Sequence, residues 1–206
     1  MAGFVPNCAE TVISMLAVSS LGGVWTSCSP DFGANGVVDR FGQVNPHILI
    51  TSNGYSYNGK LFKLEEKVNG VLESIDSIRH IVEIEYVDIK SNFNHDSIIS
   101  FGDILNNDQT QPTFEQLPFD HPLFIMYSSG TTGPPKSIVH SSGGTLIQHM
   151  KEHQLHCDIK AGKSTMFWFT TCGWMMWNWL VSGLSSGSTI VILSLIHISE
   201  PTRQPC

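Results

Sequence analysis

The 206-residue sequence predicts an α/β fold, a mostly parallel sheet with helices on both faces. Three observations support this class. Short apolar segments alternate with longer segments whose apolar residues recur at helical spacing. Clusters of glycine, asparagine and proline separate these segments. Hydrophobic residues make up 41% of the chain and charged residues 14%, so enough apolar material is present for a substantial core.

Helices and strands alternate in the first half of the sequence. The predicted order is a helix over 6–23, a strand over 24–29, a helix over 34–44, a strand over 45–53, a helix over 60–75 and a strand over 79–87. The first helix is bounded by Pro6–Asn7 and Gly22–Gly23, which favour the start and the end of a helix. Residues 60–75 are amphipathic at helical spacing, whereas residues 79–87 alternate apolar and polar side chains as a strand does.

The second half predicts the same alternation after a polar stretch. Residues 88–120 are predicted to form a long surface loop that carries one short element at 101–106. The elements that follow are a strand over 123–127, a glycine-rich loop over 128–137, a helix over 143–153, a strand over 165–171, a tryptophan-rich helix that includes 174–179, and a strand over 188–193.

The glycine-rich loop over 128–137, SSGTTGPPKS, is predicted to bind phosphate. It follows a buried strand, at the edge of the sheet where α/β proteins bind ligands. Its glycines leave backbone amides open to a phosphate, its hydroxyls add donors, and its lysine adds a positive charge. An ordinary glycine-rich turn does not require so many hydroxyl groups. The candidate phosphate-binding residues are Ser128, Ser129, Gly130, Thr131, Thr132, Gly133 and Lys136.

The spacing of this loop differs from that of P-loop NTPases. A Walker A motif has four residues between its glycines and a lysine directly after the second glycine. Here two residues separate Gly130 from Gly133, and two prolines precede Lys136. A second segment, CDIKAGKST, has Cys157 where the first glycine belongs and precedes its strand instead of following one. Both segments argue against a P-loop NTPase.

The loop and three longer segments resemble the adenylate-forming acyl ligases, which include acyl-CoA synthetases, luciferases and peptide-synthetase adenylation domains. SSGTTGPPK is similar to the phosphate-binding signature of that superfamily. Within it, NCAETVISMLAVSSLGGVWTSCSPDFGANGVVDRF, IVHSSGGTLIQHMKEH and TTCGWMMWNWLVSGL resemble the acetoacetyl-CoA synthetases. The resemblance runs from about Phe4 to Ile192. Ser137 departs from it, because most of the superfamily has glycine at that position.

The resemblance implies a two-step reaction. A carboxylate, here acetoacetate, attacks the α-phosphate of ATP bound with Mg²⁺ and releases pyrophosphate, and the thiol of CoA then displaces AMP. The loop residues Ser128 to Gly133 and Lys136 would hold the β- and γ-phosphates, an electrostatic role. The turn at Thr171, Gly173 and Trp174 would border the acyl and adenylate pocket. ATP with Mg²⁺ and CoA are thus the expected co-substrates, and no tightly bound cofactor is expected.

Other residues that could carry chemistry are given structural interpretations. Trp168 and Trp179 are interpreted as core packing, and Cys172, which has no evident base, as a small buried thiol. Four histidines lie close together in the sequence, and three of them follow helical spacing, so a metal site is conceivable. The preferred interpretation is a solvated helix face, because no recognised ligand spacing accompanies them. The histidines are His140, His149, His153 and His156.

Composition and charge limit the function classes. The formal net charge of -7 and the absence of any lysine- and arginine-rich run argue against nucleic acid as a partner. Five cysteines without CxxC spacing favour a reduced, intracellular protein. Neither a signal peptide nor an uncharged run long enough to span a membrane is apparent. The cytosol is therefore expected, with small-molecule substrates and no obligate protein partner.

The C-terminal residues 193–206 depart from the rest of the sequence. Residues 193–203, LSLIHISEPTR, match one reading frame of a transposase adapter used in sequencing libraries. Residues 1–192 are therefore interpreted as a partial N-terminal adenylation domain and residues 193–206 as a non-native tail. The resemblance places the magnesium-binding glutamate, the ribose-binding aspartate and the C-terminal domain with its adenylation lysine downstream of residue 192. On this interpretation the catalytic residues are unknown, and the chain alone is expected to be inactive and poorly soluble.

Three functional hypotheses remain open from the sequence. The first is a fragment of an AMP-forming acetoacetate–CoA ligase. The second is a fragment of a ligase for another short acid, such as acetate or propionate. The third is a short protein that binds a nucleotide without catalysis. Pyrophosphate exchange with a panel of acids separates the first two, and an encoded tail would favour the third.

Overall fold

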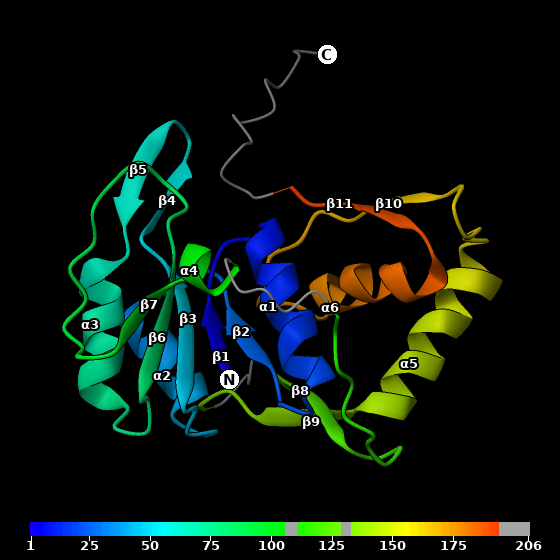
Figure 1. Cartoon of the computed structure of the whole chain (residues 1–206), viewed down its shortest axis with the longest axis horizontal. Coiled ribbons are helices and arrows are strands. Elements are labelled where there is room, and N and C mark those ends of the chain that lie inside the picture. The colour runs from blue at the N-terminus through cyan, green and yellow to red at the C-terminus, as the bar shows by residue number, and fades with distance from the viewer. Residues whose placement is uncertain (106–110, 129–132, 194–206) are drawn as a thin grey trace.

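The computed structural model of this chain describes residues 1–105, 111–128 and 133–193. Strands and helices alternate along it (Figure 1). The strands are β1 Ala2–Phe4, β2 Thr26–Cys28, β3 Ile48–Ser52, β4 Gly54–Tyr57, β5 Lys60–Lys63, β6 His80–Ile84, β7 Ile98–Ser100, β8 Pro122–Tyr127, β9 Ser137–Ser141, β10 Thr165–Phe167 and β11 Thr189–Val191. The helices are α1 Ala9–Ser20, α2 Ala34–Phe41, α3 Glu65–Ser74, α4 Phe101–Leu105, α5 Ser142–Lys151 and α6 Met175–Ser182, with a π-helical turn, η1 Glu152–His156, and a 3₁₀ turn, η2 Gly183–Ser186.

A five-stranded parallel sheet in the order β2-β1-β3-β6-β7 forms the centre of the structure. Strand β8 lies along the outer side of β2, where an isolated parallel bridge joins Trp25 to Phe124. The backbone N–H of Trp25 donates to the carbonyl of Leu123 at 3.0 Å, and the N–H of Ile125 donates to the carbonyl of Trp25 at 2.8 Å. The predicted α/β class with a mostly parallel sheet is confirmed.

Helices cover both faces of this sheet (Figure 1). Successive residues of a strand point to opposite faces, so Leu49 and Ile50 of β3 belong to different buried clusters. Leu49 packs with the apolar side chains of α2 and α3, and Ile50 packs with those of α1 and α6. The helical residues of the first cluster are Val37, Phe41, Val68 and Val71, and those of the second are Val12, Met15, Val18, Trp177 and Val181.

Strand β1 was not predicted from the sequence, although it lies between β2 and β3 in the middle of the sheet. It has only 3 residues, Ala2–Phe4, which is too short for an alternating pattern to be recognised. All of its residues are buried. A Cβ on Gly3 would lie 2.7 Å from the indole ring of Trp25, so this position requires glycine for close packing.

The predicted helix over 60–75 is wrong in its first part. Residues 60–63 form β5, which pairs antiparallel with β4, and α3 begins only at Glu65. The two strands are joined by Asn58 and Gly59, which have positive φ values of 49° and 72°. Asn-Gly between strand-forming residues favours a two-residue hairpin turn, and this signal overrides the helical spacing that residues 60–63 share with α3.

The helix expected directly after the glycine-rich loop is preceded by a strand. Strand β9 pairs antiparallel with β8, so the loop connects the two strands of a hairpin. The sequence SIVHS was not recognised as a strand because it is short and leads without a break into α5.

Residues 98–100 form β7, the parallel edge strand of the central sheet beside β6, so the prediction of a loop with a single short element over 88–120 is wrong at this point. Strand β7 has only 3 residues, too few for an alternating pattern to be recognised within a polar stretch. The remaining second-half predictions are confirmed within two to four residues, and β10 and β11 form a separate parallel pair. In the described residues no helix is long and apolar enough to cross a membrane.

Candidate functional site

The antiparallel pair β8–β9 holds the ends of the glycine-rich loop together. Tyr127 is paired with Ser137, and the N–H of Ser128 donates to the carbonyl of Lys136 at 3.0 Å. The N–H of Lys136 lies 3.3 Å from the hydroxyl oxygen of Ser128, to which it donates. The hairpin therefore fixes the backbone of Ser128 and Lys136, two of the predicted phosphate-binding residues.

The predicted loop residues are only partly visible. Ser128, Gly133 and Lys136 are described, and the side chain of Lys136 is exposed. A Cβ on Gly133 would meet no atom within 4 Å, so crowding inside the chain does not explain glycine at this position. The predicted residues Ser129, Gly130, Thr131 and Thr132 lie outside the described residues.

Gln43 binds the second strand of the loop stem, which is the paired end of β8 and β9 at Tyr127–Ser128 and Lys136–Ser137. Its Nε2 donates to the carbonyl of Pro135 at 2.7 Å, and its Oε1 accepts a hydrogen bond from Ser137 Oγ at 2.7 Å. Gln43 follows α2 and is more than 90 positions from its partners in the sequence, which is why no local motif indicated it. Most of the resembling superfamily has glycine at position 137. The hydroxyl that Ser137 has in its place thus bonds the loop stem to Gln43, after α2.

A second cation, Arg40, lies near the loop stem. Its guanidinium carbon lies 4.7 Å from the ring centre of Phe32 and 6.0 Å from that of Tyr127. The hydroxyls of Tyr127 and Thr26 lie 3.1 Å apart, which connects the end of β8 to β2. Burial raises the pKa of Tyr127 to about 12, so this phenol is neutral and available for hydrogen bonding at physiological pH.

The turn at Thr171, Gly173 and Trp174, the predicted pocket border, lies at the carboxyl end of β2. The N–H of Trp174 donates to the carbonyl of Thr171 at 3.1 Å, which closes the turn. A Cβ on Gly173 would lie 3.7 Å from the backbone nitrogen of Ser29 and 3.8 Å from the ring of Phe32. The side chain of Trp174, at the N-cap of α6, is 60% exposed.

The loop stem and this turn occupy the same edge of the sheet. Strands β2 and β8 run parallel, so Cys28 at the end of β2 and Tyr127 at the end of β8 lie on the same side. Phe32 connects the two regions, because it lies close to Gly173 and also stacks against Arg40, which lies over Tyr127. The two predicted regions therefore lie together at the carboxyl edge of parallel strands, the edge where α/β folds bind ligands.

Cys172, beside this turn, has the properties of a structural thiol. It is 0% exposed, and burial raises its pKa well above the usual range for cysteine. Ser27 Oγ donates to its backbone carbonyl at 2.7 Å. A thiol that is buried and protonated cannot act as a nucleophile, which agrees with the interpretation from the sequence.

The two tryptophans inside α6 and the one directly after β10 differ in environment. Trp177 is 0% exposed, and its Nε1–H donates to Asn7 Oδ1 at 2.8 Å. Trp179 is half-buried, with its ring centre 4.7 Å from that of His153. Trp168 is 46% exposed, so the interpretation of this residue as core packing is wrong. The error arises because β10 ends one residue earlier, and the chain then runs along the surface.

The expected solvated histidine face is also wrong. His149 and His153 are 6% and 0% exposed, and His149 Nδ1 lies 2.8 Å from Ser182 Oγ. His153 contacts Ser186 Oγ through Nδ1 and the carbonyl of Trp179 through Nε2. These contacts bind α5 and η1 to α6 and η2. Within 1–105, 111–128 and 133–193, no three His, Cys, Asp or Glu side chains are close enough to hold a metal.

The buried histidines make stability depend on pH. Burial, and to a smaller degree the neighbouring His153, lower the pKa of His149 to about 4. In the unfolded chain this histidine takes up a proton near pH 6.5, whereas in the folded chain it does so only near pH 4. The free energy of unfolding is therefore expected to fall as the pH drops from about 6.5 to 4, because the unfolded state binds more protons.

Urea unfolding at pH 7 and pH 5 measures this effect. His149→Gln should reduce the loss of stability between the two pH values, while the exposed His156 provides the matched control His156→Gln. Burial also lowers the pKa values of His140 and His153, so part of the pH dependence should remain in His149→Gln. An unchanged pH dependence in this variant would contradict the assignment.

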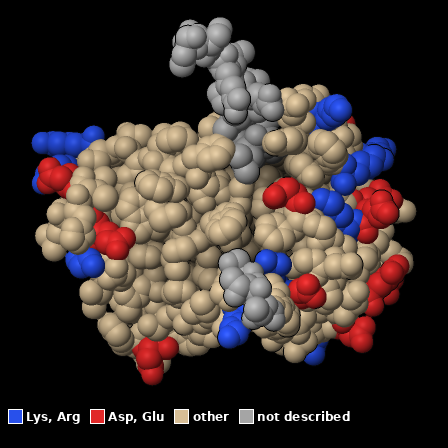
Figure 2. Space-filling view, turned by 180° about the vertical axis from the view of Figure 1, so that it is seen from behind, with Lys and Arg blue, Asp and Glu red and all other residues tan. Residues whose placement is uncertain are grey.

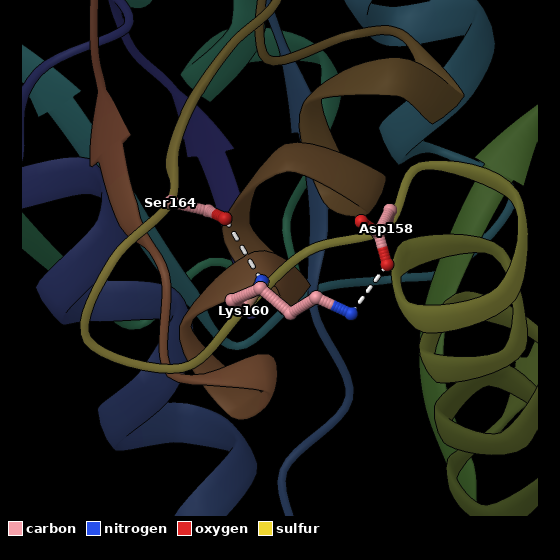
Figure 3. Close-up of polar contacts among 3 residues, drawn as sticks. All are labelled: Asp158, Lys160 and Ser164. Carbon is pink, nitrogen blue, oxygen red and sulfur yellow. Dashed lines mark hydrogen bonds and ion pairs between the residues drawn. The ribbon is translucent and has the colours of Figure 1, made fainter.

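The second glycine–lysine segment, CDIKAGKST, forms a surface turn before β10 (Figure 3). Lys160 N–H donates to Ser164 Oγ at 2.8 Å, and Lys160 Nζ pairs with the carboxylate of Asp158. Both charged side chains are mostly exposed, with relative areas of 62% and 80%. The segment precedes β10 instead of following a strand, which agrees with the argument against a P-loop at this position.

The surface carries few charges on the side of α5, where Figure 2 shows a broad area without lysine, arginine, aspartate or glutamate. Exposed apolar side chains on α5 and near β10 contribute to the uncharged surface of this part of the chain. They are Leu146, Ile147, Leu155, Phe167, Trp168, Phe169 and Trp174. Large exposed apolar side chains that are this frequent in one part of a chain are typical of a surface that another part of a protein covers.

Comparison with known proteins identifies close relatives. Residues 2–201 match the family described as AMP-binding enzyme. The acetoacetyl-coenzyme A synthetase of Rhizobium meliloti (strain 1021) is 48% identical over 193 residues, which is 93% of this chain and 30% of that protein. The malonamoyl-CoA synthetase vrtB of Penicillium aethiopicum is 42% identical over 205 residues, covering 93% of this chain and 28% of the relative.

A solved structure shows the same fold. The acetoacetyl-CoA synthetase from Streptomyces lividans superimposes with a TM-score of 0.88 at 45% sequence identity, covering 93% of this chain and 29% of that one. The chain therefore spans about 30% of the length of the relatives that it matches.

Proposed function

The chain belongs to the AMP-binding enzyme family, and from this premise we propose that it is part of an acetoacetate–CoA ligase. The observation that carries the proposal is the agreement with an acetoacetyl-CoA synthetase structure at a TM-score of 0.88 and 45% identity. The site described above supports it, because a lysine-bearing glycine loop and a tryptophan-bearing turn share one edge of the sheet.

The proposed reaction has two steps. A carboxylate oxygen of acetoacetate attacks the α-phosphorus of ATP, and pyrophosphate leaves with the electrons of the broken P–O bond. The CoA thiol then loses its proton and attacks the acyl carbon, and AMP leaves. Lys136 and the loop residues bind the β- and γ-phosphates, and Arg40 adds positive potential beside them.

The described part of the chain offers this reaction no carboxylate cluster for a magnesium ion. No step is therefore assigned to Mg²⁺ through these residues. We propose that the groups that hold Mg²⁺ and those that complete catalysis belong to the remaining length of the ligase, as the share of about 30% suggests. On this proposal the 206-residue chain alone forms no acyl-adenylate, even with ATP and acetoacetate present.

A chimeric enzyme tests the proposal. Residues 1–192 replace the matching segment of the Streptomyces lividans acetoacetyl-CoA synthetase, and ATP–pyrophosphate exchange is measured with acetoacetate, acetate, propionate and butyrate. We expect exchange that depends on acetoacetate, within about tenfold of the parent enzyme. Exchange that prefers acetate or propionate would support the alternative of another short-acid ligase. A folded chimera that exchanges with none of the acids would refute both.

The reading as a nucleotide-binding protein without catalysis makes a separate prediction. The 206-residue chain would then bind ATP by itself and form no complex with the rest of a ligase. Isothermal titration of the chain with ATP measures the first property directly.

We also propose that residues 193–206 are an adapter-derived tail and that the enzyme works in the cytosol. The adapter match over 193–203 and the free thiols Cys8, Cys28, Cys157 and Cys172 support these two statements. The family match extends to residue 201 and so overlaps the adapter match over 193–203. Because the two matches assign the same residues differently, direct sequencing of the transcript is the decisive test of the tail. A read across the codons for 191–206 should lack LSLIHISEPTR and continue into ligase sequence.

A further inference from the structure

Gln43 holds the chain on both sides of Lys136. Its Nε2 donates to the carbonyl of Pro135 at 2.7 Å, and its Oε1 accepts a hydrogen bond from Ser137 Oγ at 2.7 Å. Pro135 and Ser137 are the residues directly before and after Lys136. The amide group of one side chain thus reaches across the position of the lysine and bonds the loop stem on either side of it.

The orientation of this amide group is determined by its partners. Gln43 Nε2 also donates to the carbonyl of Asp39 at 2.6 Å. A backbone carbonyl can only accept a hydrogen bond, so the carbonyls of Asp39 and Pro135 require the NH₂ group, and the hydroxyl of Ser137 then donates to Oε1. Both donor hydrogens of Gln43 are therefore used, one on α2 and one on the loop stem. The side chain connects these two elements and has no donor left for a ligand.

Helix α2 gives Gln43 a firm support. Val37 and Phe41 of this helix are 0% exposed and pack in the same buried cluster as α3 and the central sheet. Gln43 follows Phe41 by two residues, and its backbone N–H donates to the carbonyl of Arg40 at 3.2 Å. A side chain that starts at the end of a packed helix can fix a loop more precisely than a side chain from another loop.

The backbone of Lys136 itself is bonded to β8. The N–H of Ser128 donates to the carbonyl of Lys136 at 3.0 Å, and the N–H of Lys136 donates to Ser128 Oγ at 3.3 Å. The side chain of Lys136 is exposed, and within residues 1–105, 111–128 and 133–193 no hydrogen bond or ion pair engages its ammonium group. The ammonium group is available to a ligand, while the backbone that carries it is held from two directions.

We propose that Gln43 is a positioning residue for ATP, because its bonds to Pro135 and Ser137 keep Lys136 where the ammonium group meets the β- and γ-phosphates. This proposal rests on the ligase function proposed above and deepens it. A charge that is already in place stabilises an anion without rearrangement of the protein. Without Gln43, the second strand of the stem is held by β8 alone. Lys136 must then be ordered when ATP binds, and this cost weakens the binding of ATP.

Hydrogen–deuterium exchange of the 206-residue chain, read at single amides by NMR, is the first test. In Gln43→Ala the amides of Ser128 and Lys136 should exchange at least about fivefold faster, because the stem opens more often once α2 no longer holds it. Gln148→Ala is the matched control, since Gln148 is also an exposed helix glutamine whose amide is hydrogen-bonded, to Glu152 on the side of α5. In this control the two stem amides should exchange at the parent rate.

Two outcomes of the exchange experiment would overturn the proposal. One is equal exchange of the stem amides in the parent chain and in Gln43→Ala. The other is faster exchange throughout the chain in Gln43→Ala, which would show that the substitution weakens the whole fold instead of the loop stem.

The kinetics of the chimeric ligase are the second test. Gln43→Ala should raise the KM for ATP by about five- to tenfold, the effect of losing two ordinary hydrogen bonds, and leave the KM for acetoacetate within about twofold of the parent value. Gln148→Ala should change neither KM. A fall in kcat with both KM values unchanged would show only a loss of folded enzyme and would refute the positioning role.

Variants of Ser137 test whether Gln43 acts through the loop. Ser137→Ala removes one of the two bonds and should raise the KM for ATP by about two- to threefold, whereas Ser137→Thr keeps the hydroxyl and should keep the parent KM. Adding Ser137→Ala to Gln43→Ala should have no further effect, because the bond is already lost. Effects that multiply in the double variant would contradict the pairing. A chimera that is inactive with every acid counts against the ligase function, whereas the exchange experiment still decides whether Gln43 holds Lys136.

Discussion

Replacing Lys136 by alanine in the chimeric ligase is expected to lower ATP–pyrophosphate exchange by about a hundredfold or more. The hairpin β8–β9 fixes the backbone of Lys136 beside Ser128, while its side chain stays exposed at the ligand edge of the sheet. On the proposed function, its ammonium group would balance the charge that builds up on pyrophosphate as the P–O bond breaks. Exchange at saturating acetoacetate, measured against ATP concentration, separates an effect on the rate from one on ATP binding.

Lys160→Ala is the matched control for this prediction. Lys160 is also an exposed lysine in a glycine-containing segment, but it is paired with Asp158 (Figure 3) and lies in the turn before β10, not in the loop over 128–137. The Lys160→Ala chimera should catalyse ATP–pyrophosphate exchange at the rate of the parent chimera. If both variants lose activity equally, or if Lys136→Ala stays within threefold of the parent, the phosphate role of the loop is refuted.

Replacing Trp177 by alanine is expected to reduce the free energy of unfolding of the chain by about 3–5 kcal/mol. Its side chain is 0% exposed and fills the space between α6 and the sheet. The change also removes the donor to Asn7 Oδ1, which leaves a buried amide oxygen unpaired. Urea unfolding followed by far-UV circular dichroism measures the loss.

A control variant and a conservative variant accompany Trp177→Ala. Trp174→Ala, on the same helix but 60% exposed, should cost less than about 1 kcal/mol. Trp177→Phe keeps most of the volume and removes only the indole N–H, so it should fold even where Trp177→Ala does not, at a cost of about 1–3 kcal/mol. Equal losses in Trp174→Ala and Trp177→Ala would contradict the packing of α6 described here.

The sequence predicted the elements that are long enough to show a period. Helix α1 and strands β3 and β6 fall inside their predicted ranges because their apolar residues repeat over several turns or residues. Strand β1, with 3 residues, shows no such repeat, and its place in the centre of the sheet is set by pairing with β2 and β3. The β4–β5 hairpin was predictable from Asn58–Gly59, but the helical spacing of the next segment was given more weight.

The candidate site was predictable only where it is local in the sequence. The loop over 128–137 and the turn over 171–174 could be identified from residue types alone. Gln43 and Arg40 could not, because each comes from the α2 region and reaches its partners only through the fold. Spacing likewise places His149 and His153 on one helix face, but not which element packs against it; α6 does so and buries both.

The division of the core between the two faces of the sheet has a consequence for synthesis on the ribosome. The cluster on the α2 and α3 side contains no described residue beyond Phe93, so all of its members are available once the first half of the chain has emerged. The cluster on the opposite face includes Phe124 and Trp177, and it stays incomplete until α6 has been made. Chains fold as they are made, and a layer that is complete early can protect the central strands while later segments are still being added. We therefore expect the α2–α3 layer to form first, and α1 to complete its packing only after α6 has been synthesised.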